Sequence, residues 1–94
     1  MKIKEHFHGK VCTLEVKGDL MGGPETQVVH DRVKSLIEEG FNQVVIDLGN
    51  VKWMNSSGLG VIMSSYTSLK AVDGVLHLAR ATEKVESLMI ITQL

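Results

Sequence analysis

The chain has 94 residues, of which 44% are hydrophobic and 22% charged, a length and composition that predict one globular domain. Its formal net charge of −1 leaves no basic excess to hold a phosphate backbone, which argues against nucleic-acid binding. The apolar runs are too short to span a membrane, and the first residues lack the apolar segment of a signal peptide. The chain has one cysteine, so no intrachain disulfide can form. Together these features predict a cytoplasmic protein.

Two short alternating segments, residues 3–8 and 11–16, open the chain on either side of Gly9-Lys10. A two-residue turn that contains glycine between such segments predicts a β-hairpin. In the first segment Ile3 and Phe7 share a face, and in the second one face carries Cys12, Leu14 and Val16. Cys12 is therefore expected to be a buried core thiol and not a reactive one.

A helix is predicted from Pro24 to just before Gly40. Proline suits a first helical residue, because its φ is already helical and its missing N–H is not needed there. Glu25 suits the helix dipole and Gly40 the left-handed cap. One face of this helix is apolar, because positions i, i+4, i+7 and i+8 are occupied by Val29, Val33, Leu36 and Ile37.

The continuous apolar segment 44–48 predicts a central, parallel strand that is apolar on both faces. A loop over 49–56 follows, and a second helix begins near Ser57. The apolar face expected of this helix consists of Leu59, Ile62, Met63, Tyr66 and Leu69.

A turn at Asp73-Gly74 leads into a predicted strand over 75–79, and Thr82 can cap a third helix that carries Val85, Leu88 and Met89. After the hairpin, helices and strands therefore alternate. Right-handed crossovers between such strands build a mostly parallel sheet covered by helices, so the predicted fold class is α/β.

The most informative segment, residues 53–60, follows the central strand and opens the second helix. It places Asn55, Ser56 and Ser57 beside the free N–H groups of a helix start. One interpretation is simple capping, since asparagine and serine are preferred N-cap residues. The other is a site for an anion or a phosphoserine, which the same N–H groups and the helix dipole favour.

At this point the sequence resembles the STAS-domain anti-sigma-factor antagonists of bacteria. The apolar strand 44–48 followed by 54–62, Met-Asn-Ser-Ser-Gly-Leu-Gly-Val-Ile, is similar to their strand, loop and Asp-Ser-(Ser/Thr)-Gly-Leu-Gly helix start. Gly18-Asp19-Leu20 and the turn at Gly74 also match, so the resemblance covers nearly the whole chain. It implies a single small STAS-type domain over residues 1–94, expected to lack the family's C-terminal extension.

The resemblance implies a binding protein without a reaction or cofactor of its own. Its unphosphorylated form would bind an anti-sigma factor of the histidine-kinase-like ATPase type and so regulate sigma-factor-dependent transcription. Phosphorylation of Ser56, with Ser57 in reserve, would end that binding, and a serine phosphatase would reverse it. The expected partner-binding residues are Met21, Gly22, Trp53, Asn55, Ser56, Ser57, Gly58 and Leu59.

Three features depart from the family pattern. Asn55 replaces the usual aspartate, residues 21–23 replace a stretch that usually carries an aspartate, and Leu94 ends the chain soon after the third helix. The first two favour an alternative, namely a STAS scaffold that is never phosphorylated, or a subunit of a signalling, transport or lipid-trafficking complex.

Other chemistries find little support. Asp47 lacks the acidic pair of a receiver domain, no P-loop is present, and Met63 stands where a dinucleotide fingerprint needs its third glycine. His6 and His8 share a strand face, but no cysteine or second histidine pair supports a metal site. We therefore expect no catalytic residue and no metal, while Trp53 is either a partner anchor or a plug for the end of the sheet.

Overall fold

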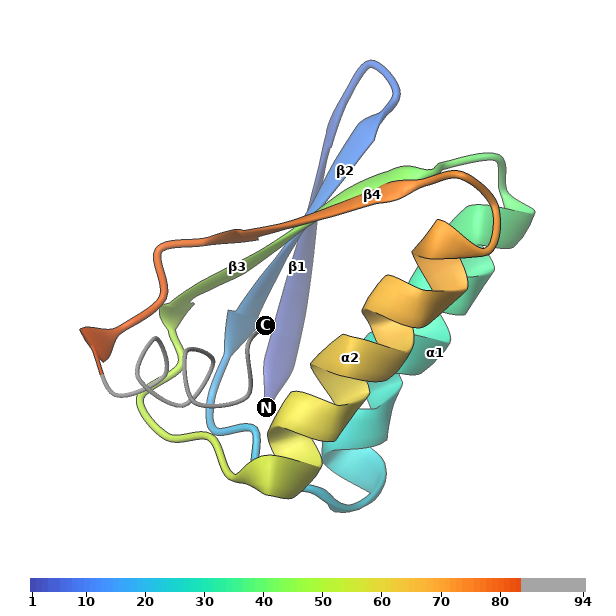
Figure 1. The fold of residues 1–94 in the computed structure, drawn as a ribbon. Coiled ribbons are helices and arrows are strands. Elements are labelled where there is room, and N and C mark those ends of the chain that lie inside the picture. The colour runs from blue at the N-terminus through green and yellow to red at the C-terminus, as the bar shows by residue number, and fades with distance from the viewer. Residues whose placement is uncertain (84–94) are drawn as a thin grey trace.

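The computed structural model describes residues 1–83 and shows one layer of strands against one layer of helices (Figure 1). The α/β class predicted from the sequence is confirmed, and so is the predicted element order as far as the strand at residues 75–79. The predicted third helix, with Val85, Leu88 and Met89, lies outside the described residues. The elements are β1 (Lys2–His8), β2 (Val11–Lys17), α1 (Gly23–Glu38), β3 (Gln43–Asn50), α2 (Ser56–Lys70) and β4 (Val75–Ala79).

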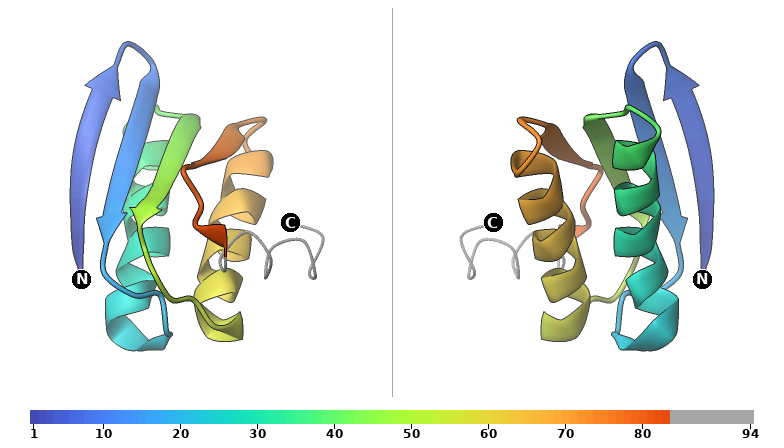
Figure 2. Two further views of the ribbon diagram at one scale, coloured as in Figure 1. Left: turned by 90° about the vertical axis from the view of Figure 1, so that its left-hand side faces the viewer. Right: turned by 90° about the vertical axis from the view of Figure 1, so that its right-hand side faces the viewer.

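The four strands form one sheet in the order β1-β2-β3-β4. β1 pairs antiparallel with β2 through the predicted turn, whereas β2, β3 and β4 are mutually parallel. Both crossovers place their helices on the same face of the sheet, so α1 and α2 lie side by side and begin at the same edge (Figure 2). The helical cover is thus confirmed for one face, while no helix within residues 1–83 covers the other.

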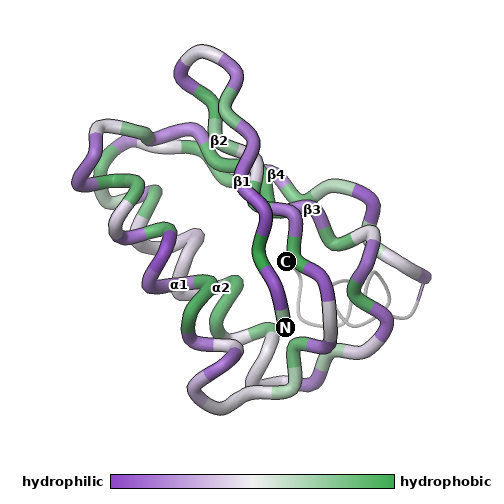
Figure 3. Tube along the Cα trace, turned by 180° about the vertical axis from the view of Figure 1, so that it is seen from behind, coloured by the Kyte–Doolittle hydropathy of each residue, from purple (hydrophilic) through white to green (hydrophobic). Residues whose placement is uncertain are grey.

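The core lies between the sheet and the two helices. Figure 3 shows hydrophobic residues interspersed with hydrophilic ones along the chain, and along β2 and β3 buried side chains alternate with less buried ones, because only alternate side chains face the helices. Cys12 is fully buried as predicted, and burial raises the pKa of its thiol. The fully buried hydrophobic residues from the strands and α1 are Cys12, Leu14, Val16, Val29, Val33, Leu36, Val44, Ile46 and Leu48.

The C-terminal half of α1 is anchored by a backbone cap and by an arginine. Gly40 has φ +97° and donates its N–H to Ile37 O at 3.0 Å, which confirms the predicted left-handed cap. Arg32 joins the helix to the edge strand through Glu5, with its Nη2 at 2.8 Å from Glu5 Oε1, and also contacts Glu39 at 3.0 Å. These two carboxylates raise the pKa of the Arg32 guanidinium further above its ordinary value.

The buried face of α2 differs from the prediction. Met63 and Tyr66, expected in the core, are 44% and 40% exposed, and Ser65 is fully buried instead. The Ser65 hydroxyl donates to Val61 O at 2.9 Å, so this small side chain is buried without an unsatisfied group. The face that meets the core is therefore rotated from the one that apolar spacing alone predicted.

Candidate functional site

The site is built from two loops that follow the neighbouring strands β2 and β3. Leu20 and Met54 form an isolated parallel bridge between these loops. The Leu20 N–H donates to Trp53 O at 3.0 Å, and the Asn55 N–H donates to Leu20 O at 3.2 Å. Because β2 and β3 are adjacent and parallel, their loops leave the same edge of the sheet and meet there.

A glycine allows the start of α2 to approach the first loop. A Cβ on Gly58 would lie 1.9 Å from Leu20 O, a distance that no side chain can occupy. Gly58 is buried, and Leu59, only 2% exposed, belongs to the core. Both residues were expected in the partner-binding set, and the structure places them beneath that surface.

Asn55 is the N-cap of α2. Its Oδ1 accepts a hydrogen bond from the Gly58 N–H at 2.9 Å, as the capping interpretation predicted. Its Nδ2 also donates to Met21 O at 2.9 Å, a contact that spacing in the sequence could not indicate. One side chain thus caps the helix and ties the other loop to it.

Ser56 and Ser57 are the first two residues of α2, and both are exposed. Neither hydroxyl has a hydrogen-bond partner among residues 1–83, and the first turn of the helix carries no acidic residue. Ser57 faces the other loop, where a Cβ on Gly22 would come within 2.9 Å of its Cβ. Both serines therefore stand at the positive end of a helix dipole that no acidic side chain of that turn neutralises.

Each of the two loops of the site also carries a large, half-exposed side chain. Met21, in the first loop, is 52% exposed, and Trp53, just before Asn55, is 51% exposed. Such exposure fits a surface position for Trp53 better than a plug in the end of the sheet. Half-exposed aromatic and sulfur-containing side chains are typical of protein-binding surfaces.

An ion pair braces the ends of β3 and β4 before the second loop begins. Arg80 Nη2 lies 2.8 Å from Asp47 Oδ2, and the Gly49 N–H donates to Asp47 Oδ1 at 2.9 Å. Together these contacts, the Arg80 pair foremost, lower the pKa of Asp47. No local pattern pointed to Arg80, whose backbone has φ +54° and whose guanidinium covers Gly49.

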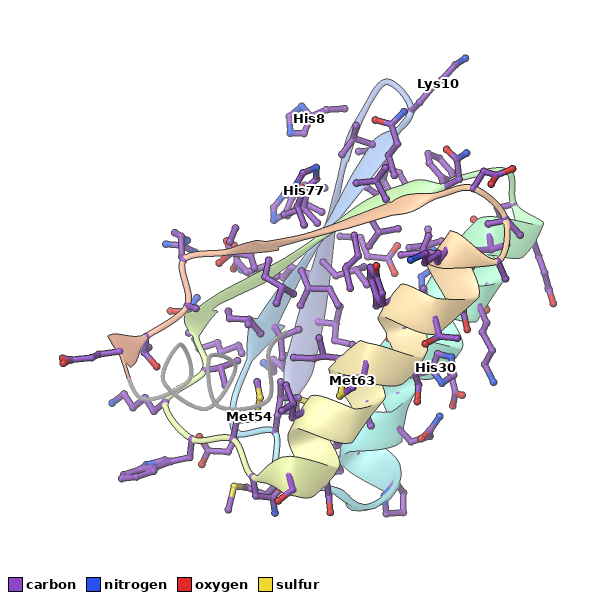
Figure 4. All side chains as sticks on the ribbon, in the orientation of Figure 1. His8, Lys10, His30, Met54, Met63 and His77 are labelled. Atoms are coloured by element: carbon purple, nitrogen blue, oxygen red, sulfur yellow. The ribbon has the colours of Figure 1, made fainter. Side chains whose placement is uncertain are left out.

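The remaining predicted candidates do not gather at this site. His8 and His77 project from the sheet face that lies away from the helices (Figure 4). His6, on the same strand as His8, has its Nε2 3.7 Å from Glu15 Oε2. Within residues 1–83 there is no group of three or more histidine, cysteine or acidic side chains placed to hold a metal ion. In the same part of the chain, no helix is long and apolar enough to cross a membrane.

Sequence comparison finds two kinds of match. The model of the STAS domain family matches residues 2–94. A Thermotoga neapolitana protein, provisionally named an anti-sigma factor antagonist and TM1081 homologue, is 33% identical over 58 residues. That segment is 62% of this chain and 51% of the relative, so the chain spans about half the length of the curated relative that it matches.

Solved structures share the fold. TM1081 of Thermotoga maritima, also provisionally named an anti-sigma factor antagonist, superposes with a TM-score of 0.88 at 23% identity, over 97% of this chain and 78% of that one. The Bacillus anti-sigma factor antagonist SpoIIAA, in its unphosphorylated form, gives 0.79 at 15% identity, over 96% of this chain and 83% of that one. At these identities the likeness concerns the fold alone.

Proposed function

The chain belongs to the STAS domain family, and from that premise we propose that it is an anti-sigma-factor antagonist, a binding protein that phosphorylation of Ser56 switches off. In its unphosphorylated form it binds an anti-sigma factor through the surface formed by Met21, Gly22, Trp53, Asn55, Ser56 and Ser57, hereafter the switch surface. This binding frees a sigma factor and so regulates transcription.

The observation that carries the proposal is the chemical setting of Ser56. Its hydroxyl is exposed and unengaged within the described chain, at the start of a helix whose first turn has no acidic residue. A phosphate there adds roughly −1.5 to −2 charges, which the helix dipole stabilises within this chain. The same charge would lie on the proposed contact surface, where a partner must desolvate it.

The proposed partner is an anti-sigma factor of the histidine-kinase-like ATPase type that acts as the serine kinase, with a serine phosphatase for the return step. Among the structural relatives, SpoIIAA is known in a phosphorylated form, which makes the comparison relevant to this step. Such a partner set places the chain in the bacterial cytoplasm and requires no reaction, cofactor or metal from the chain itself.

The test is intact mass spectrometry after incubation with ATP and the serine-kinase anti-sigma factor encoded nearest in the same genome. We expect a gain of about 80 Da that maps to Ser56. The gain is lost in Ser56→Ala and retained in Ser57→Ala, which is the matched control one residue away. A gain confined to Ser57 would contradict the assignment of the acceptor.

A second candidate function rests on Asn55. Its amide lacks the negative charge of the family's usual acid, and both of its polar atoms are engaged. This favours a STAS scaffold that binds its partner without phosphorylation, in a signalling, transport or lipid-trafficking complex. No mass gain, together with a stable complex with the anti-sigma factor, would support this scaffold and exclude the switch.

A further inference from the structure

One peptide group, the one that joins Met21 to Gly22, is held from both sides. Its carbonyl oxygen accepts a hydrogen bond from Asn55 Nδ2 at 2.9 Å, and its N–H donates to Thr26 Oγ1 at 3.0 Å. Asn55 is the N-cap of α2, and Thr26 lies in the first turns of α1. This single peptide therefore connects the starts of the two helices.

The connection depends on an amide at position 55. Asn55 uses its oxygen to accept from the Gly58 N–H and its nitrogen to donate to Met21 O. An ionised carboxylate has acceptors only, and a serine hydroxyl is too short to serve both partners. Aspartate or serine at position 55 would still be a good N-cap, but neither side chain could at the same time donate a hydrogen bond to the Met21 carbonyl.

The held peptide also lies against Ser57. A Cβ on Gly22 would be 2.9 Å from Ser57 Cβ, so the loop and the first turn of α2 are in close contact. The backbone bridge between the two loops joins Leu20 to Met54, one residue before the held peptide. Beyond that bridge, the position of Met21 relative to Ser56 depends on the Asn55 side chain.

We propose that Asn55 is a positioning residue that holds the Met21–Gly22 peptide against the start of α2, so that the switch surface is preformed before a partner arrives. This inference rests on the proposed function and adds the residue that sets the geometry of its binding surface. A preformed surface loses less conformational entropy on binding. The amide at position 55 thus lacks the negative charge of an aspartate, but it can hold the first loop in place.

The test compares two substitutions that preserve the cap, Asn55→Asp and Asn55→Ser, one with and one without a charge. Native-state amide hydrogen exchange is measured at Gly22, whose N–H belongs to the held peptide. We expect exchange at Gly22 to become about tenfold faster in both variants. The Leu20 amide is the internal control, because it donates to Trp53 O and does not depend on the Asn55 side chain.

The unfolding midpoint separates positioning from general loss of structure. Aspartate caps a helix as well as asparagine does and also suits the dipole, so the midpoint of Asn55→Asp should stay level or rise. Faster exchange at Gly22 in a protein of undiminished stability is the signature of a positioning role. Unchanged exchange at Gly22 in both variants would overturn the inference.

Binding to the anti-sigma factor provides the second readout. We expect about tenfold weaker affinity for both variants, since one hydrogen bond that orders the surface is lost. If both variants bind as tightly as the unsubstituted chain, the positioning role in binding is refuted while the proposed function stands. If the unsubstituted chain itself does not bind, the proposed function fails, and the exchange at Gly22 still decides whether Asn55 holds the loop.

Discussion

The two helices begin at the same edge of the sheet in different ways. α1 follows Gly22, which has φ +95° and no capping side chain, and has Glu25 in its first turn. α2 follows Asn55, which caps it in extended geometry, and has no acidic residue in its first turn. The dipole of α1 is thus already matched by a fixed charge, whereas the first turn of α2 carries no such charge, and the proposed phosphate on Ser56 would supply one.

The largest expected effect on stability concerns Gly58 in the first turn of α2, compared with Gly23 at the first position of α1. In Gly58→Ala the new Cβ would lie 1.9 Å from Leu20 O, so the helix must move away from the first loop. We expect a loss of about 3 kcal/mol or more in the free energy of unfolding, measured with urea. Gly23→Ala is the control, because its Cβ meets nothing within 4 Å and only φ +80° opposes it.

For Gly23→Ala the expected loss is about 1 kcal/mol, the usual cost of a left-handed residue with a side chain. The two losses thus separate a steric requirement at α2 from a conformational one at α1. Equal losses would mean that the approach of α2 to Leu20 is not as close as described.

A smaller effect should follow from moving charge between the two starts. Ser56→Asp supplies α2 with the charge that α1 already has, and we expect a gain of about 0.5 kcal/mol in stability. Glu25→Gln removes the charge from α1 and should lose a similar amount. Thermal unfolding at low salt measures both, and about 1 M salt should diminish both changes. If Ser56→Asp is less stable than the parent, the α2 dipole does not favour a negative charge at Ser56.

The smallest effect concerns the contact between the two helices further along their length. His30 Nε2 lies 2.9 Å from Ser68 Oγ, and burial, assisted by Lys34, lowers the pKa of His30 below its ordinary value. The unfolded chain then binds a proton at a higher pH than the folded chain does, so stability declines as the pH falls below about 6.5.

Unfolding midpoints between about pH 7 and pH 5 should therefore decrease slightly, and His30→Gln should remove that part of the decrease. If the unfolding midpoint of His30→Gln falls by the same amount over this pH range, the pH dependence is due to groups other than His30. The pH effect is expected at the contact between the helices and not at the two starts, where no histidine takes part in a described contact.

The fold could be predicted from the sequence because its signals are local. The alternation in residues 3–8 and 11–16, the turn at Gly9 and the cap at Gly40 each depend on neighbouring residues, and all are confirmed. The family resemblance is confirmed as well. Met63 and Tyr66 were misplaced, because apolar spacing cannot show that a small serine faces the core.

The site could be predicted only in part. The position of Asn55, Ser56 and Ser57 at a helix start follows from local pattern, and the structure places them there. The contacts of Asn55 with Met21 and of Gly58 with Leu20 join residues more than thirty positions apart. Such contacts depend on which strands are neighbours and in which register, and no local signal carries that information.

The pairing of β2 with β3 has a register shift between Glu15 and Lys17, just before the first loop. The offset between paired residues grows by one across that irregularity and by one more between Lys17 and Leu20, which brings Leu20 opposite Met54. A single residue inserted or deleted between Lys17 and Leu20 would displace the buried Leu20 side chain and shift the first loop relative to the start of α2. This short stretch is therefore constrained in length by the buried Leu20 and in composition by Gly18, whose φ is +119°.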